Sequence, residues 1–293
     1  MAQEGLLATS RLFASAVLQQ LAKRGRSPLF TTYFRQAALF RPEGRRMRVR
    51  DAFDVAFARL TREGCRDEYV YKSALVRRIV LGRHSLRTAS VLSEFRVEGC
   101  KADIAILNGT STAYEIKSER DSLFRLDRQV GAYGNVFARV YVVTAESHLS
   151  AVLNAIPRET GVMTVNKRFQ ISTVREASDR VDQVSPVSIF DSIRTEEARR
   201  ILVSLGLPVP NVPNTELSDF LRQEFVKLTP REAHAGMVQV LKRTRAQYQL
   251  ADLVSELPDS LHTAALIVPV RKSDQKRLVA AVNTCLDEAM TWG

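Results

Sequence analysis

The chain has 293 residues, 45% of them apolar, which is enough for one large domain or two smaller ones with a packed core. Its 43 Lys and Arg exceed its 32 Asp and Glu, and the net charge of +11 favours polyanionic partners such as nucleic acid. Apolar residues near the N-terminus are interrupted by Arg11, unlike a secretory signal, and no apolar run approaches the about 18 residues of a membrane span. Three scattered cysteines imply neither a disulfide framework nor a zinc cluster, so we expect reduced thiols, a cytoplasmic location and no membrane partner.

Residues 1–62 are predicted to form an N-terminal helical region with a basic loop. Apolar side chains recur at helical spacing in two stretches, at Leu12, Val17, Leu18 and Leu21 and again at Phe53, Val55, Phe57 and Leu60. Between them lies RPEGRRMRVRD, which carries Arg45, Arg46 and Arg48. Such a run is either a solvated loop or a segment that contacts phosphates and positions nucleic acid without reading its sequence.

Residues 63–172 are predicted to form an α/β core with a mixed central sheet. The segment DEYVYKSALVRRIVLG has helical spacing and ends at Gly82, and SVLSEFRV and KADIAIL have the composition of strands. Asn108-Gly109 predicts a tight turn that reverses the chain into TAYEIKS, so a hairpin is expected. SLFRLDRQVGAY then predicts a helix, RVYVVT a central strand, and VMTV at 162–165 a further strand.

Residues 173–293 are predicted to form a C-terminal helical region. Its helices include TEEARRILVSLG with Thr195 as cap, TELSDFLRQEFVKL, TPREAHAGMVQVLKRTR with Thr229 as cap and Pro230 at the first position, and a last helix SDQKRLVAAVNTCLDEAM. Prolines at 208, 210 and 213 mark the connections. A protein partner could bind through this region.

The stretch YEIKSERD is either a charged strand at a solvated edge or part of a metal-dependent active site. In a strand Glu115 and Lys117 project from the same face, and pairing across the Asn108-Gly109 turn can bring Asp103 near Glu115. Two close carboxylates repel each other unless a cation lies between them, and hard oxygen ligands suit Mg²⁺ or Mn²⁺. The carbonyl of Ile116 could add a ligand, and Lys117 could orient the attacking water or neutralise charge on phosphorus.

Asp103 followed by Glu115-Ile116-Lys117, flanked by strands and followed by a helix, resembles the PD-(D/E)XK nuclease superfamily, with its restriction-endonuclease-like αβββαβ core. The stretch is similar to a poorly characterised bacterial branch, in which EIKS, an acidic residue, Arg-Leu, Gln and Tyr recur; the last three are here Arg125-Leu126, Gln129 and Tyr133. The Gln-x-x-x-Tyr spacing resembles that of RecB-type members.

The resemblance implies further site residues. Gln129, Tyr133 and Arg125 would lie near the substrate, and an acidic residue of the first core helix would complete the metal ligands. Glu68 is the best match, ahead of Glu63 and Asp67, and Glu94 of SEF either points toward the site or pairs with Arg96. The residue before Asp103, proline in the name of the superfamily, is Ala102 here, and proline is often absent from members.

The sequence therefore predicts a Mg²⁺- or Mn²⁺-dependent nuclease acting on phosphodiesters, with DNA as the expected partner and a homodimer left open by the resemblance. Asp103, Glu115, Lys117 and Gln129 would be catalytic, and Glu68, Asp103, Glu115 and Ile116 would bind the metal. The alternative is a nuclease-fold protein with vestigial chemistry that acts as a nucleic-acid-binding or regulatory module. No Gly-x-Ser-x-Gly elbow, phosphate-binding Gly-Lys loop or histidine pair at zinc spacing supports another hydrolase.

Overall fold

The computed structural model describes residues 2–39, 46–62, 64–83, 88–119, 121–245, 247 and 250–293. The chain divides into two compact units: unit 1 comprises Met1–Arg83 with Gln247–Gly293, and unit 2 comprises His84–Ala246. This division differs from the three predicted regions, because the last helices pack on the first ones instead of continuing the helical region after residue 173. The hydroxyl of Thr31, for example, donates to the carbonyl of Ala289 at 3.0 Å.

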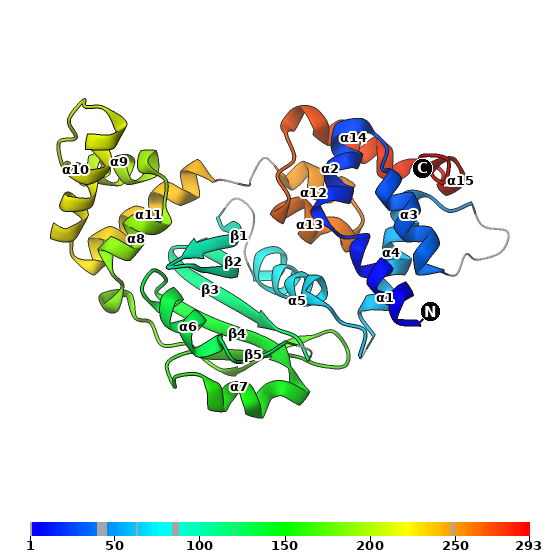
Figure 1. The fold of residues 1–293 in the computed structure, drawn as a ribbon, viewed down its shortest axis with the longest axis horizontal. Coiled ribbons are helices and arrows are strands. Elements are labelled where there is room, and N and C mark those ends of the chain that lie inside the picture. Colours follow the sequence, from blue (N-terminus) through cyan, green and yellow to red (C-terminus); the bar gives the residue numbers. More distant parts are fainter. Residues whose placement is uncertain are drawn as a thin grey trace. The chain divides into compact units, whose positions relative to one another are not determined.

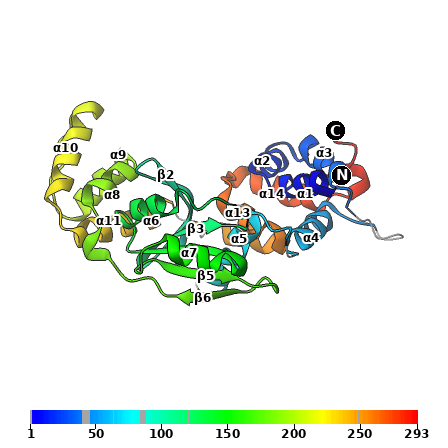
Figure 2. The same cartoon turned by 60° about the horizontal axis from the view of Figure 1, so that its bottom comes forward.

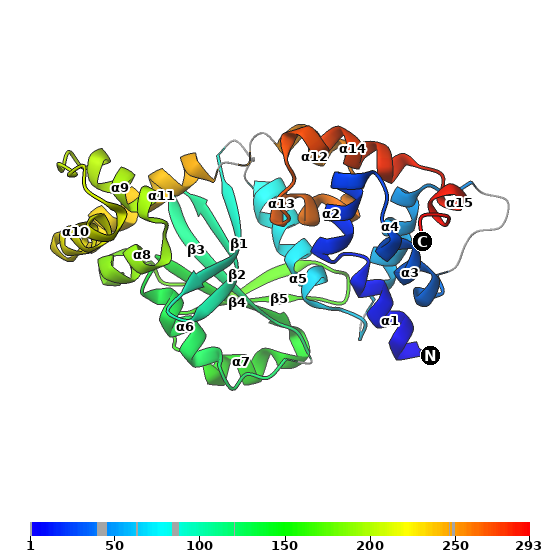
Figure 3. The same cartoon turned by 45° about the horizontal axis from the view of Figure 1, so that its top comes forward.

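Unit 1 is helical, and N-terminal helices (blue) lie beside C-terminal ones (orange to red) in Figure 3. Its elements are α1 (Ala2–Arg11), α2 (Ser15–Arg24), α3 (Pro28–Ala37), α4 (Val49–Leu60), α5 (Glu68–Leu75), a π-helical segment (Val76–Arg83), α12 (Ala251–Glu256), a 3-10 turn (Asp259–Leu261), α13 (His262–Ile267), α14 (Lys272–Asn283) and α15 (Leu286–Ala289). The single last helix that was predicted is wrong, because the chain is extended at Thr284 and Cys285, between α14 and α15.

Unit 2 is built on a six-stranded mixed sheet in the order β1-β2-β3-β4-β5-β6. Figure 1 labels β1 to β5. The strands are β1 (Ser90–Val97), β2 (Cys100–Asn108), β3 (Thr110–Lys117), β4 (Arg139–Ala145), β5 (Gly161–Val165) and β6 (Ile171–Arg175). β3, β4 and β5 run parallel, and the other neighbours pair antiparallel. The α/β class and the mixed sheet are confirmed at this level.

Helix α6 (Leu126–Gly134) contacts β2, β3 and β4, while α7 (Leu149–Ala155) contacts β4 after a short 3-10 turn (Glu146–His148). The predicted strand at 162–165 corresponds to β5, whose residues are all buried, as expected for a strand inside the sheet. The strand β6, which the prediction missed, pairs with β5 at the edge (Figure 2). Predicted helix 122–133 begins only at Leu126, so residues 122–125 form a connection instead.

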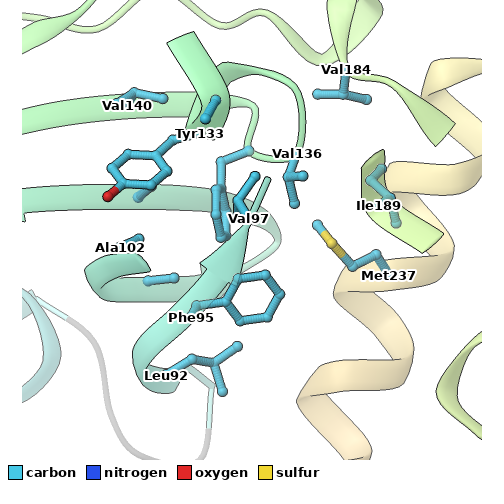
Figure 4. Packing of buried hydrophobic residues seen from close by; sticks show 14 of the residues in the cluster. Leu92, Phe95, Val97, Ala102, Tyr133, Val136, Val140, Val184, Ile189 and Met237 are labelled. Carbon is cyan, nitrogen blue, oxygen red and sulfur yellow. The ribbon is translucent and has the colours of Figure 1, made fainter. Parts of the chain in front are cut away.

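Four helices continue unit 2 beyond the sheet: α8 (Pro186–Ser192), α9 (Thr195–Ser204), α10 (Asn214–Lys227) and α11 (Pro230–Thr244), preceded by a 3-10 turn (Val181–Gln183). Thr229 caps α11 as predicted, accepting a hydrogen bond from the amide of Glu232, whereas Thr195 is the first residue of α9 and Arg194 takes the cap position. Phe95 of β1, Val136, Ile189 of α8 and Met237 of α11 share one buried apolar cluster (Figure 4). Sheet and helices therefore have a common core.

Among the described residues, no helix has the length and apolar character needed to cross a membrane. Cys65, Cys100 and Cys285 are free thiols.

Candidate functional site

The β2–β3 hairpin fixes Asp103 next to the Glu-Ile-Lys triplet. Gly109, with φ of 70°, makes the predicted turn, and the ladder runs from Asn108↔Thr110 to Ile104↔Tyr114. The regular pairing of β2 with β3 ends there. At the next residue, Oδ2 of the Asp103 side chain accepts a hydrogen bond from the amide of Ile116 at 2.7 Å. Asp103 thus contacts the peptide group that joins Glu115 to Ile116. This confirms the hairpin, with the two strands diverging at Asp103.

Glu115 and Lys117 point to the same face of β3 and form a buried ion pair. The exposed fraction of Glu115 is only 3%, and Lys117 Nζ lies 2.7 Å from Glu115 Oε1. A buried pair repays its desolvation only with good geometry and additional hydrogen bonds. Those bonds come from α6, where Gln129 Nε2 donates to Glu115 Oε1 at 2.6 Å and Gln129 Oε1 accepts from Lys117 Nζ at 2.9 Å.

Tyr133, one turn further along α6, holds the other oxygen of Glu115. Its Oη lies 2.8 Å from Glu115 Oε2 and 2.7 Å from the carbonyl of Lys101. Burial raises the pKa of Tyr133 above its usual range, and the negative charges of Glu115 and Asp103 raise it further. The phenol therefore stays protonated and acts as a donor. Gln129 and Tyr133 both contact Glu115, the residue that the sequence placed at the centre of the site.

Glu94 of β1 is held in an unusual backbone conformation opposite Asp103. Its φ is 53°, and the β1–β2 ladder passes from Ser93↔Ile104 to Phe95↔Ala102 without it. A left-handed non-glycine residue costs about 1–3 kcal/mol and persists where its surroundings impose it. A carboxylate oxygen of Glu94 lies within 4.8 Å of one of Asp103, and Lys101 Nζ lies 3.8 Å from Glu94 Oε2. This proximity to Asp103 fits the first of the two alternatives predicted for Glu94, in which it points toward the site.

The oxygens at this end of the sheet suit a hard divalent cation. The carboxylates of Asp103 and Glu94 lie close together, so their negative charges repel each other. A bound metal ion, or a proton on one of them, relieves this repulsion. The carbonyl of Ile116 points to the same side as its amide, toward Asp103, because N–H and C=O of one strand residue project in the same direction. Both oxygens of Glu115, in contrast, accept hydrogen bonds from neighbouring side chains.

Glu68, the remaining predicted ligand, belongs to unit 1. It is the first residue of α5, is exposed, and pairs with Lys72 at 2.5 Å. Of the weaker candidates, Asp67 is the N-cap of α5 and Glu63 lies outside the described residues. The role of Glu68 as a metal ligand stays a prediction.

A pocket of about 440 Å³ opens beside the ion pair. It is lined by Lys117, Asp121, Ser122, Phe124, Arg125 and Gln129. Asp121 Oδ2 holds the chain after β3 by accepting both the amide and the hydroxyl of Ser118, each at 2.7 Å. The hydroxyl of Thr144 fixes the carbonyl of Lys117 at 2.8 Å. Lys117, Gln129 and the predicted Arg125 thus share one solvent-accessible hollow, which sequence periodicity does not reveal.

The basic segment lies in unit 1. Arg45 is outside the described residues, and Arg46 is exposed. Arg48 precedes α4, where its amide donates to Asp51 Oδ2 at 2.8 Å. Its guanidinium lies 3.5 Å from Asn283 Oδ1. Phosphate contact by these arginines stays a prediction.

Comparison with known proteins gives a family for this chain. Protein cII of Enterobacteria phage P4 is 34% identical over 98 residues, an aligned stretch that covers 33% of this chain and 33% of that protein. A solved structure of a protein of unknown function from Silicibacter pomeroyi aligns with 40% of this chain and 80% of its own length, at 22% identity and a TM-score of 0.28, which is too low to support an argument. The family model described as bacteriophage P4 protein cII matches residues 61–253, about two thirds of the chain, and the chain belongs to this family.

Proposed function

We propose that unit 2 carries the active site of a metal-dependent nuclease that hydrolyses phosphodiester bonds, with DNA as substrate. The observation that carries the proposal is a set of hydrogen bonds of 2.6–2.9 Å around β3. They join Glu115, Lys117 and Gln129 to one another and Asp103 to the amide of Ile116, and Lys117 and Gln129 also line the pocket. The order α5, β1, β2, β3, α6, β4 along the chain fits the restriction-endonuclease-like core that the motif resembles.

Each residue has a chemical part in this proposal. Asp103, Glu94 and the carbonyl of Ile116 would hold Mg²⁺ or Mn²⁺, with Glu115 as a further ligand. The ion would polarise the phosphate and lower the pKa of a bound water. Gln129 and Tyr133 orient Glu115, and Lys117, which faces the pocket, stabilises negative charge that develops on the phosphate.

One observation favours a second function, a nucleic-acid-binding or regulatory module with vestigial chemistry. The hydrogen-bonding capacity of Glu115 is met by Lys117, Gln129 and Tyr133 within the protein itself. Such a network is stable without a metal ion. Nucleic-acid binding with no uptake of a divalent ion would favour this function.

Cleavage of labelled single-stranded, duplex and branched DNA and of RNA, with Mg²⁺, Mn²⁺ or EDTA, tests the proposal. We expect divalent-dependent cleavage that falls at least about 100-fold in Glu115→Gln and in Lys117→Ala, because each removes a group that acts on the reacting phosphate or its metal. Glu119→Gln, an exposed carboxylate next to the same strand, is the matched control. Circular dichroism of every variant separates lost chemistry from lost fold. Cleavage that is unchanged in both site variants would refute the assignment.

A further inference from the structure

Phe124 exposes an aromatic ring at the pocket. Its exposed fraction is 93%, against 46–63% for the other exposed large apolar residues of the described chain, none of which is aromatic. It lies in the connection between β3 and α6, where its amide donates to Ser122 Oγ at 3.3 Å and the amide of Leu126 donates to the carbonyl of Leu123 at 2.9 Å. The backbone around the ring is therefore held in place.

The other walls of the pocket are polar, with two cationic side chains and one carboxylate. Lys117 and Arg125 contribute an ammonium and a guanidinium, Gln129 an amide and Ser122 a hydroxyl, while Phe124 is the only apolar side chain among the six that line it. The sixth residue, Asp121, carries a carboxylate whose Oδ2 accepts hydrogen bonds from the amide and hydroxyl of Ser118. An interface for a folded protein has several apolar side chains at its centre. One ring, an amide and two cations, which outnumber the single carboxylate, instead match the groups of a nucleotide, which has a flat base and an anionic phosphate.

We infer that this pocket holds one unpaired nucleotide of a single-stranded DNA segment, with its base stacked on Phe124 and its phosphate facing Lys117 and Arg125. The inference rests on the proposed function and names the substrate class of that site. The volume of about 440 Å³ lies within the range of ligand pockets, roughly 300–1,000 Å³. In a duplex the faces of a base are covered by its neighbours, so a single exposed ring selects a base that has left the stack.

Binding measured without cleavage tests this inference. Fluorescence anisotropy with a labelled oligonucleotide of about 16 nucleotides, single-stranded or annealed, is recorded in EDTA so that the substrate stays intact. We expect Phe124→Ala to weaken single-strand binding roughly 5- to 150-fold, the range for one lost base–aromatic stack, and duplex binding less than about twofold. Val203→Ala, another exposed apolar residue of unit 2, is the matched control. Equal single-strand affinity, or equal weakening for both oligonucleotides, would overturn the inference.

A second readout places the base on the ring directly. Trp292 is the only tryptophan of the chain, so Phe124→Trp in a Trp292→Phe background gives a single reporter at the pocket. We expect its fluorescence to be quenched when the single-stranded oligonucleotide binds, and binding without quenching would contradict stacking at this position. If the wild type cleaves no substrate but these binding differences persist, the nuclease proposal fails and the nucleotide pocket stands. If cleavage occurs and Phe124→Ala binds normally, only the pocket assignment fails.

Discussion

The two units of this chain differ in charge and in chemistry. Unit 1 has 21 Lys and Arg against 13 Asp and Glu, a net charge of +8, whereas unit 2 has 22 against 19, a net charge of +3. The ion pair, the strained Glu94 and the pocket all lie in unit 2. A net charge of +11 thus says little about where the chemistry lies. Most of the net positive charge and the proposed reaction therefore lie in different units.

The largest expected effect on stability lies in unit 2, at Arg245. Its guanidinium donates to both oxygens of the buried Glu197, at 2.8 and 2.7 Å, and lies over the ring of Phe95. Burial alone would raise the pKa of Glu197, but the hydrogen bonds from Arg245 and from the amide of Arg194 outweigh it and hold that pKa below its usual range. Arg245→Met leaves a buried carboxylate without its cation and should cost about 3 kcal/mol of unfolding free energy.

Hydrogen exchange in β2 and β3 would report this loss in unit 2, while the fluorescence of Trp292, packed near Phe30, reports unit 1. The double variant Glu197→Gln with Arg245→Met should recover most of the stability, because the unpaired charge is gone. An Arg245→Met variant with unchanged exchange would show that the pair contributes little.

A smaller effect is expected from pH, through His234. Its Nε2 lies 2.8 Å from the buried hydroxyl of Ser111, and burial lowers the pKa of His234 although the charge of Asp179 acts weakly in the opposite direction. Below the unfolded pKa of about 6.5, the unfolded chain takes up a proton that the folded chain does not, so the stability of unit 2 should fall between about pH 7 and pH 5. His234→Gln should flatten this dependence in denaturant titrations. A wild type and variant with parallel pH profiles would contradict the prediction.

The smallest expected effect concerns the basic segment of unit 1. If Arg46 and Arg48 contact phosphates, replacing both with Ala should reduce the slope of log affinity against log salt by up to about 0.9 for each lost contact on duplex DNA. Arg199→Ala with Arg200→Ala in unit 2, where both pair with Glu196, is the matched control. The reverse outcome, a larger change in the unit 2 double variant, would place the nucleic-acid surface in the other unit.

Local patterns predicted the features that depend on neighbouring residues. Asn108-Gly109 predicted the hairpin because an Asn-Gly pair favours the positive φ of a tight turn, and alternation placed Glu115 and Lys117 on one face. The spacing of Gln129 and Tyr133 placed both on one side of a helix, and both contact Glu115.

Features that depend on packing between segments far apart in the chain could not be predicted from the sequence. Helical periodicity shows that α14 is amphipathic but not that it packs with α2, so the domain boundaries could not be drawn from composition. The strand β6 is short and half exposed, which gives little contrast with a loop. Nothing in SVLSEFRV predicts that Glu94 adopts a left-handed backbone conformation. Helical spacing places Phe124 in the predicted helix, whereas α6 begins two residues later, at Leu126.

Titration of Mn²⁺ by calorimetry tests the central claim most directly, with wild type and Asp103→Asn compared. Asparagine keeps an oxygen that can accept the amide of Ile116 but lacks the charge, so metal binding is separated from the hairpin geometry. Asp127→Asn, an exposed residue of α6, is the matched control. We predict saturable uptake by the wild type and by Asp127→Asn, and affinity at least about tenfold weaker in Asp103→Asn. No uptake by the wild type, or equal uptake by Asp103→Asn, would contradict a metal site at Asp103.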